Sequence, residues 1–369
     1  MPQHTPIVPS ADELRALDQE DLELDELLDP EEACTELYEH FRFVVDKGQS
    51  PIRIDKYLTD RMEYSSRNRI QQAADAGAIM VNGKAVKSNY KVKPLDIISI
   101  VMDRPRQTLE IIPEEIPLEI IYEDEYLMVV NKKPGMVVHP GRGNYTGTLV
   151  NAIAWHLKDE PSFNSDDPRL GLVHRIDKDT SGLLVIAKDP FSKAHLSEQF
   201  FNKTTKRQYN ALVWGIVKED TGRIEGHVGR NLRNRENMDV FPDGDHGKHA
   251  VTHYEVIERL GYVTLVRCHL ETGRTHQIRV HMRYIGHTLF NDARYGGEAI
   301  LKGNRSGSYK QFISNCFDAC PRQALHARTL GFEHPITHEI MHFEAPLPED
   351  MTALLEKWRR YSSSPTISQ

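Results

Sequence analysis

Two polar stretches in the second half of the chain carry side chains suited to acid, base or nucleophilic chemistry. The first, GLVHRIDKDTSG at residues 171–182, places Asp177 between Arg175 and Lys178. Neighbouring cations lower the pKa of a carboxylate, so Asp177 is expected to stay ionised, as a nucleophile or a base requires. The apolar run LLVIA follows, which predicts a loop held by a buried strand. On this pattern alone, a charged surface turn is the alternative.

The second stretch, ETGRTHQIRVH at residues 271–281, alternates polar and apolar residues. The alternation predicts a strand with His276 and Ile278 on one face and with Gln277, Arg279 and His281 on the other. A Gln-x-Arg pair that faces a pocket can hydrogen-bond a base and bind a carboxylate through two parallel bonds.

An aromatic residue beside basic residues forms a third candidate, KRQY at residues 206–209. Tyr209 could stack on a nucleobase, a contact worth roughly 1–3 kcal/mol. It also opens an apolar run, so a core tyrosine at the start of a strand is the alternative.

Apolar runs predict the elements that must position these side chains. Strand-like and helical patterns from 115 to 361 predict an α+β domain around a mixed, mostly antiparallel sheet. Residues 362–369 are expected to form a frayed tail. The expected strands cover 120–122, 127–130, 183–187, 209–214 and 263–270, and the expected helices cover 191–201 and 351–361.

Net charge argues against a nucleic-acid partner until the charge is located. The 369 residues carry 46 Lys and Arg against 54 Asp and Glu, a formal net charge of −8. Residues 1–45 hold −11 of it, whereas residues 47–106 carry +6. An acidic extension, assigned to 1–48, therefore precedes a basic module. This asymmetry is typical of proteins that bind nucleic acids.

Composition excludes several classes of protein. Hydrophobic residues make up 39% of the chain, enough for a core, so whole-chain disorder is excluded. No run reaches the roughly 18 apolar residues of a membrane-spanning helix. The N-terminus lacks a secretory pattern, and four cysteines are too few for a disulfide framework. We therefore expect a cytoplasmic protein, and a monomer.

Residues 49–108 have the pattern of a small α/β module. Two short helices, the second from Arg67 to Ala76, precede an Asn82-Gly83 turn between apolar runs, which is a strong hairpin signal. This pattern resembles the S4-like RNA-binding domain, in which the second helix and the hairpin present basic residues to RNA. A generic basic module is the alternative. The resemblance implies RNA contacts through Arg67, Arg69, Lys84 and Lys87.

Several motifs, in order, resemble the RluA/RluD-type pseudouridine synthases over about residues 50–350. The resemblance implies the pseudouridine synthase fold and isomerisation of uridine to pseudouridine in RNA. The implied substrate is large-subunit (23S) ribosomal RNA, free or within an assembling subunit, and neither a metal nor another cofactor is implied. The motifs are NKKPGMVVHPG, HRIDKDTSGLLVIAK, KRQYNALVWG, ETGRTHQIRVHMRYIGHTLFND and ALHARTLGFEHP.

The same resemblance assigns roles to individual residues. Asp177 matches the essential aspartate, Arg279 the basic residue that pairs with it, and Ile278 the apolar residue beside the base. Arg175 matches the arginine that enters the RNA stack where the flipped-out uridine leaves. Tyr209 matches the active-site tyrosine. Whether Asp177 acts as a nucleophile or as a base that assists glycosidic cleavage stays open.

Two other functions would account for parts of the same pattern. A non-catalytic S4-type RNA-binding or ribosome-assembly factor would use the basic module alone, and would not need Asp177, Tyr209 and Arg279 together. A metal hydrolase is suggested by Cys316-x3-Cys320 near His326, but the chain has neither an HExxH motif nor paired CxxC motifs.

Overall fold

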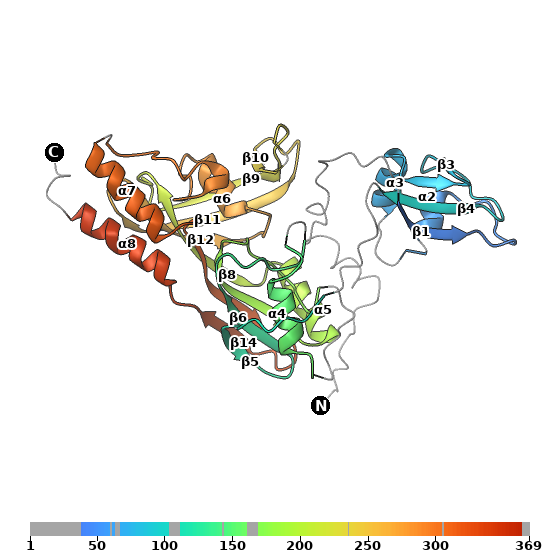
Figure 1. Cartoon of the computed structure of the whole chain (residues 1–369), viewed down its shortest axis with the longest axis horizontal. Helices are drawn as coiled ribbons and strands as arrows, with labels where there is room; N and C mark the ends of the chain where they lie inside the picture. The colour runs from blue at the N-terminus through green and yellow to red at the C-terminus, as the bar shows by residue number, and fades with distance from the viewer. Residues whose placement is uncertain are drawn as a thin grey trace, which may run out of the picture. The chain divides into compact units, whose positions relative to one another are not determined.

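The computed structural model describes residues 38–59, 61–62, 67–102, 111–141, 144–160, 169–234, 236–304 and 306–363. The described residues form two compact units, one ending at residue 102 and the other beginning at residue 111 (Figure 1). Most of the predicted acidic extension and residues 364–369 of the predicted tail lie outside this part of the chain. No helix in the described ranges is long and apolar enough to cross a membrane.

The small unit contains a four-stranded sheet and two helices. The strands follow the order β1-β4-β2-β3. Asn82 and Gly83 connect β2 to β3 with φ angles of 52° and 77°, which confirms the predicted hairpin. The elements are β1 (Tyr38–Val44), α2 (Ile54–Thr59), α3 (Arg67–Asp75), β2 (Ile79–Val81), β3 (Lys84–Ala85) and β4 (Ile97–Met102).

Strand β1 corrects the predicted start of this unit. It lies within 1–48, the range assigned to the acidic extension, and it pairs antiparallel with β4, Phe43 opposite Ile98. Phe41 and Phe43 share one face and pack against the core of the small unit. The acidic residues that precede β1 dominate the composition of the segment and hide this short alternation. The sheet therefore begins about ten residues before the predicted boundary at 49.

A buried carboxylate, Asp55, joins α2 to α3. Its side chain is fully buried and accepts hydrogen bonds from Arg53 Nε and Nη2 at 3.0 and 2.8 Å. It also accepts bonds from Arg67 Nε at 3.1 Å and Gln71 Nε2 at 2.8 Å. Burial alone would raise the pKa of Asp55, but these donors hold it well below its ordinary value. Arg67, a predicted RNA contact, thus has a structural partner, although 54% of its side chain is exposed.

The large unit is built on a ten-stranded sheet in the order β10-β9-β11-β12-β8-β13-β7-β6-β5, with β14 paired to β13. Among the described strand pairs only β13 and β7 run parallel, so the predicted mixed, mostly antiparallel sheet is confirmed. The strands are β5 (Ile120–Glu123), β6 (Leu127–Lys132), β7 (Ser181–Ala187), β8 (Lys206–Trp214), β9 (Thr221–Arg230), β10 (Met238–Phe241), β11 (Lys248–Arg259), β12 (Val263–Leu270), β13 (Leu325–Glu333) and β14 (Ile340–Glu344). The helices are α4 (Leu149–His156), α5 (Pro190–Phe201), α6 (Gln277–Tyr284), the 3-10 turn η2 (Ala293–Tyr295), α7 (Gly307–Ala319) and α8 (Glu349–Ser362).

Strand β8 shows how this sheet divides the core. Ala211 and Val213 pack in the cluster that includes residues of α4 and α6, whereas Leu212 and Trp214 pack with α7 and α8. Since side chains alternate along a strand, Tyr209 lies on the same face as Ala211. That face is the one on which the candidate site is built.

The predicted strand over residues 274–281 is wrong, because Gln277–Tyr284 form helix α6. Residues 277–282 of α6 are all buried, and polar and apolar residues alternate along them with the period of a strand, which is why the pattern indicated the wrong element. Gln277 fixes the turn before the helix, since its Oε1 accepts from Thr272 Oγ1 at 2.7 Å and from the Arg274 backbone N–H at 3.0 Å. Gln277 therefore serves the scaffold instead of pairing with Arg279 toward a base.

We expect Asp55→Asn to loosen the small unit, because it removes the charge that Arg53 and Arg67 bind in a buried position. The free energy of unfolding of this unit should fall by about 3 kcal/mol. Hydrogen exchange of the α2 and α3 amides in the full chain measures it. Because the pKa of Asp55 is lowered, its contribution is complete above about pH 4 and is lost as the pH falls further.

Asp75→Asn is the matched control for this test, since Asp75 is exposed in the last turn of α3. Amide protection in Asp55→Asn equal to that of the control would contradict a stabilising role for Asp55.

Candidate active site

The loop that carries Asp177 is fixed at both ends by a close backbone approach that needs glycine. Gly171 has a φ of +74°, and a Cβ there would lie 1.8 Å from the carbonyl oxygen of Ala187 in β7. Gly182 has a φ of +120°, and a Cβ there would lie 2.2 Å from the carbonyl oxygen of Ala327 in β13. Both ends of the loop are therefore tied to the parallel pair of strands.

Buried side chains hold the middle of this loop. His174 is stacked on Phe200 with ring centroids 4.4 Å apart, and its Nε2 accepts from the Val185 N–H at 3.1 Å. Burial lowers the pKa of His174 to about 3, so the ring stays neutral, as a bracing role requires. Ile176 is buried, whereas Arg175 between them is exposed.

A buried lysine of the NKKPG motif grips the same loop. Lys132, 2% exposed, donates from Nζ to the carbonyl oxygens of Lys133, Met136 and Lys178 at 2.8–2.9 Å. Lys178 directly follows Asp177 in the chain. The three carbonyl oxygens match the three donors of an ammonium group, so the motif anchors the loop beside its carboxylate.

Arg279 and two carboxylates form the centre of the site. Arg279 Nε and Nη2 donate to Asp292 at 2.8 and 2.9 Å, and Nη1 donates to Asp177 Oδ2 at 2.9 Å. The side chains of Arg279, Asp177 and Asp292 are 5%, 21% and 0% exposed. The guanidinium is thus fixed by the buried Asp292 while its remaining arm holds the partly exposed Asp177.

A histidine completes the surroundings of Asp177. His276 Nε2 lies 4.0 Å from Asp177 Oδ1, and His276 Nδ1 is 2.7 Å from the Tyr295 hydroxyl. The same hydroxyl accepts the Met238 N–H at 3.0 Å, and Nε2 of His276 is the ring nitrogen that faces Asp177.

The carboxylate of Asp177 is ionised at neutral pH. Burial works to raise its pKa, but His276 and Arg279 outweigh burial and lower the pKa to about 2. Arg279 is correspondingly held in its charged form, with its pKa raised by the two carboxylates against the effect of burial.

One cavity of about 310 Å³ opens onto this carboxylate. Its lining contains all five residues that the sequence assigned to the active site, Arg175, Asp177, Tyr209, Ile278 and Arg279. The structure therefore brings them together from a loop, a strand and a helix, while their individual roles stay predictions.

Residues other than these five complete the site. Asp292, His276 and Tyr295 hold Arg279 or Asp177, and Leu325 lines the cavity. Asp292 ends the motif that begins at Glu271, but no local pattern separates its buried carboxylate from those of surface aspartates. The partner of Asp292, Arg279, becomes visible only when η2 packs against α6.

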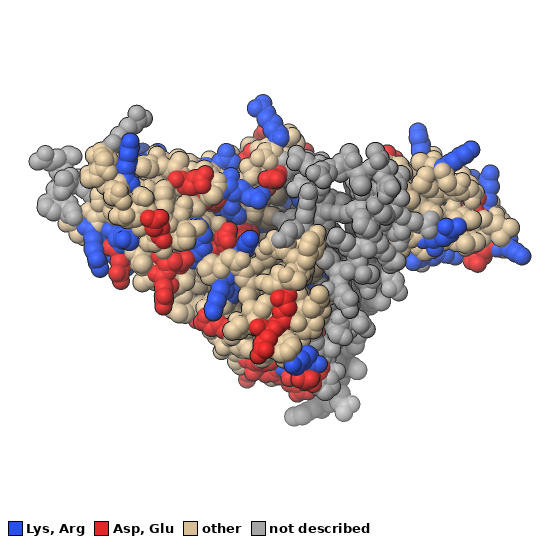
Figure 2. Space-filling view, in the orientation of Figure 1, with Lys and Arg blue, Asp and Glu red and all other residues tan. Residues whose placement is uncertain are grey.

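The predicted RNA contacts of the small unit have different settings. Lys84 lies in β3, Lys87 follows it, and both are exposed on a unit from which basic side chains protrude (Figure 2). Arg67 binds Asp55, and Arg69 lies in α3 with its side chain outside the described part of the structure.

One group among the described residues has the composition of a metal site, His195, Glu333 and His338, with ligand atoms within 4.8 Å of one another. Gln199 is fixed by two hydrogen bonds to the Glu333 backbone, and its amide nitrogen faces His195 Nδ1 at 3.1 Å. The lone pair of His195 Nδ1 therefore accepts a hydrogen bond from Gln199, and His195 Nε2 carries the ring proton. In this arrangement neither ring nitrogen of His195 has a lone pair available for a metal ion. None of the three residues lines the cavity at Asp177.

Family models match both units of the chain. The S4 domain matches residues 52–98, and the RNA pseudouridylate synthase family matches residues 126–284. The second match includes Asp177, Tyr209 and Arg279.

Relatives extend the similarity over most of the chain. A Chlorobaculum parvum protein named an uncharacterized RNA pseudouridine synthase is 49% identical, over 85% of this chain and 96% of its own. A ribosomal large subunit pseudouridine synthase D from Zymomonas mobilis is 42% identical, over 82% of this chain and 93% of its own. The chain belongs to the RNA pseudouridine synthases, a family of isomerases. The solved human RNA pseudouridylate synthase domain containing 4, 21% identical over 65% of this chain and 93% of its own, shares the fold with a TM-score of 0.52.

We expect Arg279→Gln to raise the pKa of Asp177 from about 2 toward the ordinary carboxyl value near 4, because the variant removes the adjacent positive charge. Carbon NMR of carboxyl-labelled protein measures this pKa, with the Asp177→Asn spectrum identifying the resonance.

Arg283→Gln removes an exposed charge from the same helix and should leave the pKa of Asp177 unchanged. An equal pKa in both variants would show that Arg279 does not control the ionisation of Asp177.

Proposed function

We propose that Asp177 is the catalytic residue of a uridine-to-pseudouridine isomerisation in RNA carried out in the cavity beside Arg279. The reaction breaks the N1–C1′ bond of uridine, turns the base, joins C5 to C1′, and moves the C5 proton off the ring while N1 gains one. The observation that carries the proposal is the ionised Asp177 at the wall of a cavity at the small end of the range for ligand sites.

The low pKa of Asp177 favours a nucleophilic role. A general base works best when its pKa lies near the working pH, and a carboxylate with a pKa of about 2 is a poor proton acceptor. The same low pKa makes the carboxylate a good leaving group, which a nucleophile that attacks and then departs must be. Arg279 keeps the carboxylate charged and oriented throughout.

The other cavity residues fit the handling of a flipped-out base. Extrusion of a uridine costs a few kcal/mol, and the exposed Arg175 is placed to fill the vacated position in the stack. Burial raises the pKa of Tyr209, so its phenol stays protonated and offers a flat face for stacking rather than a phenolate base. Ile278 adds an apolar surface beside it.

We infer that the RNA is large-subunit ribosomal RNA, bound free or in an assembling subunit, by a monomer in the cytoplasm. The relative named ribosomal large subunit pseudouridine synthase D supports this target, as does the match to the S4 domain. The exposed Lys84 and Lys87 would neutralise phosphates, a contribution that is strong but largely independent of sequence.

We expect Asp177→Asn to abolish pseudouridine formation, with a loss of at least about a thousandfold, because the amide keeps the shape of the side chain and removes its charge. Pseudouridine mapping of ribosomal RNA from cells with wild type, the variant or a gene deletion tests this. The exposed Asp318→Asn on α7 is the matched control.

Two outcomes of the mapping would contradict the proposal. Modification at wild-type level in Asp177→Asn would remove Asp177 from the chemistry. A deletion strain with every ribosomal pseudouridine intact would instead argue against this target and favour a binding or assembly factor.

We expect Lys84→Gln combined with Lys87→Gln to weaken RNA binding and to reduce the slope of log affinity against log salt by about 1 to 2, since two phosphate contacts are lost. Neither lysine has a described structural partner, whereas a change at Arg67 would also disturb Asp55. Lys302→Gln with Lys310→Gln, both exposed in the large unit, makes the same charge change as a control. Equal salt slopes in the two double variants would sink the RNA-binding role of the hairpin.

A further inference from the structure

The backbone directly after Asp177 is held at three consecutive carbonyl groups. The carbonyl oxygen of Asp177 accepts the Thr180 N–H at 3.1 Å, which closes a turn. The next, on Lys178, accepts from Lys132 Nζ at 2.8 Å and from the Gly135 N–H at 3.0 Å. The third, on Asp179, accepts from Arg322 Nη1 at 2.8 Å. Two buried basic side chains from opposite ends of the large unit's sequence therefore bind adjacent carbonyls of this turn.

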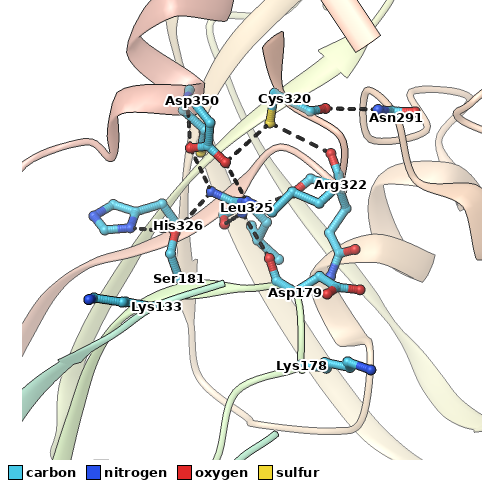
Figure 3. Close-up of polar contacts among 12 residues, drawn as sticks. Lys133, Lys178, Asp179, Ser181, Asn291, Cys320, Arg322, Leu325, His326 and Asp350 are labelled. Atoms are coloured by element: carbon cyan, nitrogen blue, oxygen red, sulfur yellow. Dashed lines mark hydrogen bonds and ion pairs between the residues drawn. The ribbon is translucent and has the colours of Figure 1, made fainter. Parts of the chain in front are cut away.

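Arg322 makes more contacts than Lys132 does. It lies between α7 and β13 and is 7% exposed. Its Nε and Nη2 donate to Asp350, in the first turn of α8, at 2.7 and 3.0 Å. Nη2 also donates to Ser181 Oγ at 3.2 Å, and Nη1 donates to the carbonyl of Leu325 at 3.0 Å. One guanidinium thus joins the Asp177 loop, the start of β13 and α8 (Figure 3).

The cluster around Arg322, which includes Asp350, Ser181, Leu325 and Cys320, also contacts the segment that fixes Arg279, the partner of Asp177. Cys320 Sγ contacts Asp350 Oδ2 at 3.9 Å and the Arg322 carbonyl at 3.7 Å, and the Cys320 carbonyl accepts from Asn291 Nδ2 at 2.8 Å (Figure 3). Asn291 directly precedes Asp292, the carboxylate that fixes Arg279. One side of the cluster therefore leads to Asp177 and the other to Arg279.

We propose that Arg322 is a positioning residue that sets the relative placement of Asp177 and Arg279 from outside the cavity. The proposal rests on the proposed role of Asp177. Among the cluster residues only Leu325 lines the cavity. The Arg322 guanidinium therefore acts through the Asp179 carbonyl and Ser181 on one side. On the other side it acts through Asp350, which contacts Cys320 and so leads to Asn291. A buried guanidinium must keep its partners, so its loss frees the turn after Asp177 while leaving the RNA-facing surface intact.

Arg322→Lys tests this assignment. Lysine keeps the charge and can bind Asp350, but a single ammonium cannot reach Asp350, the Asp179 carbonyl and Ser181 in the same geometry. The single-turnover rate of pseudouridine formation on saturating RNA should fall at least about tenfold, because a small misplacement of a catalytic group is costly. The Kd for RNA should stay within twofold, and the NMR-measured pKa of Asp177 should rise because its pairing with Arg279 loosens.

Arg328→Lys is the matched control, since Arg328 lies on β13 and bridges to Glu344 and the Ala345 carbonyl. It should keep the wild-type rate. Asp350→Asn removes the carboxylate that holds the Arg322 guanidinium but leaves the contacts of Arg322 to the loop in place. It should lower the rate several-fold with the Kd for RNA unchanged. This variant is the test to use if Arg322→Lys does not fold.

Three results would overturn the positioning role. A folded Arg322→Lys or Asp350→Asn with the wild-type rate is the first, and rate and affinity falling together is the second. An unchanged pKa of Asp177 despite a slower rate is the third. Asp177→Asn in the same assay separates the two proposals. An active Asp177→Asn would contradict the proposed function. An inactive Asp177→Asn beside a fully active Arg322→Lys would contradict only the positioning role of Arg322.

Discussion

The ion pairing of one buried guanidinium determines the geometry of the active site. Arg279 presents its N–H groups in a fixed plane; two of them bind Asp292 and one binds Asp177. Asp292 has no solvent exposure, so separating it from Arg279 would leave a buried charge without a partner, at a cost of several kcal/mol. Arg279 is therefore immobile, and Asp177 lies where the remaining donor points.

This ion pair also accounts for the chemistry that the cavity supports. Two carboxylates around one arginine would leave an excess negative charge, and His276 is the group placed to compensate it beside Asp177. Burial alone would protonate the carboxyl group, whereas these neighbours keep it ionised without full exposure to water. A charged carboxylate in a partly buried site is a stronger reactant than one in bulk solvent, because its surroundings need little reorganisation during the reaction.

The sheet brings together what the sequence keeps far apart. The loop with Asp177 enters β7, Arg322 precedes β13, and these two strands form the parallel pair. Residues more than a hundred positions apart, such as Asp177 and Arg279, then lie within hydrogen-bond distance. Local pattern predicts the pieces of this arrangement well: the Asn82-Gly83 hairpin, the buried β7, and helices α5 and α8 lie where apolar runs, turn residues and periodicity indicate them. The roles of Arg175, Asp177, Tyr209, Ile278 and Arg279, by contrast, were assigned through resemblance of whole motifs.

The errors have physical causes of two kinds. Helix α6 was predicted as a strand because polar and apolar residues alternate along its first six positions, and the tertiary packing that buries all six is not visible in that pattern. Asp292 and Arg322 were not singled out because their importance lies in tertiary partners, and a buried aspartate or arginine has the same letter as an exposed one.

The role of a charged residue in the small unit likewise depends on its tertiary partners. A count of basic residues does not distinguish a phosphate contact from an internal ion pair. Arg67 is committed to Asp55, whereas Lys84 and Lys87 are exposed on the hairpin. The net charge of −8 therefore says little about the partner, because each charge acts according to where the fold places it and over distances limited by screening. In the proposed function, RNA affinity and catalysis therefore depend on different cations, the exposed lysines of one unit and the buried arginines of the other.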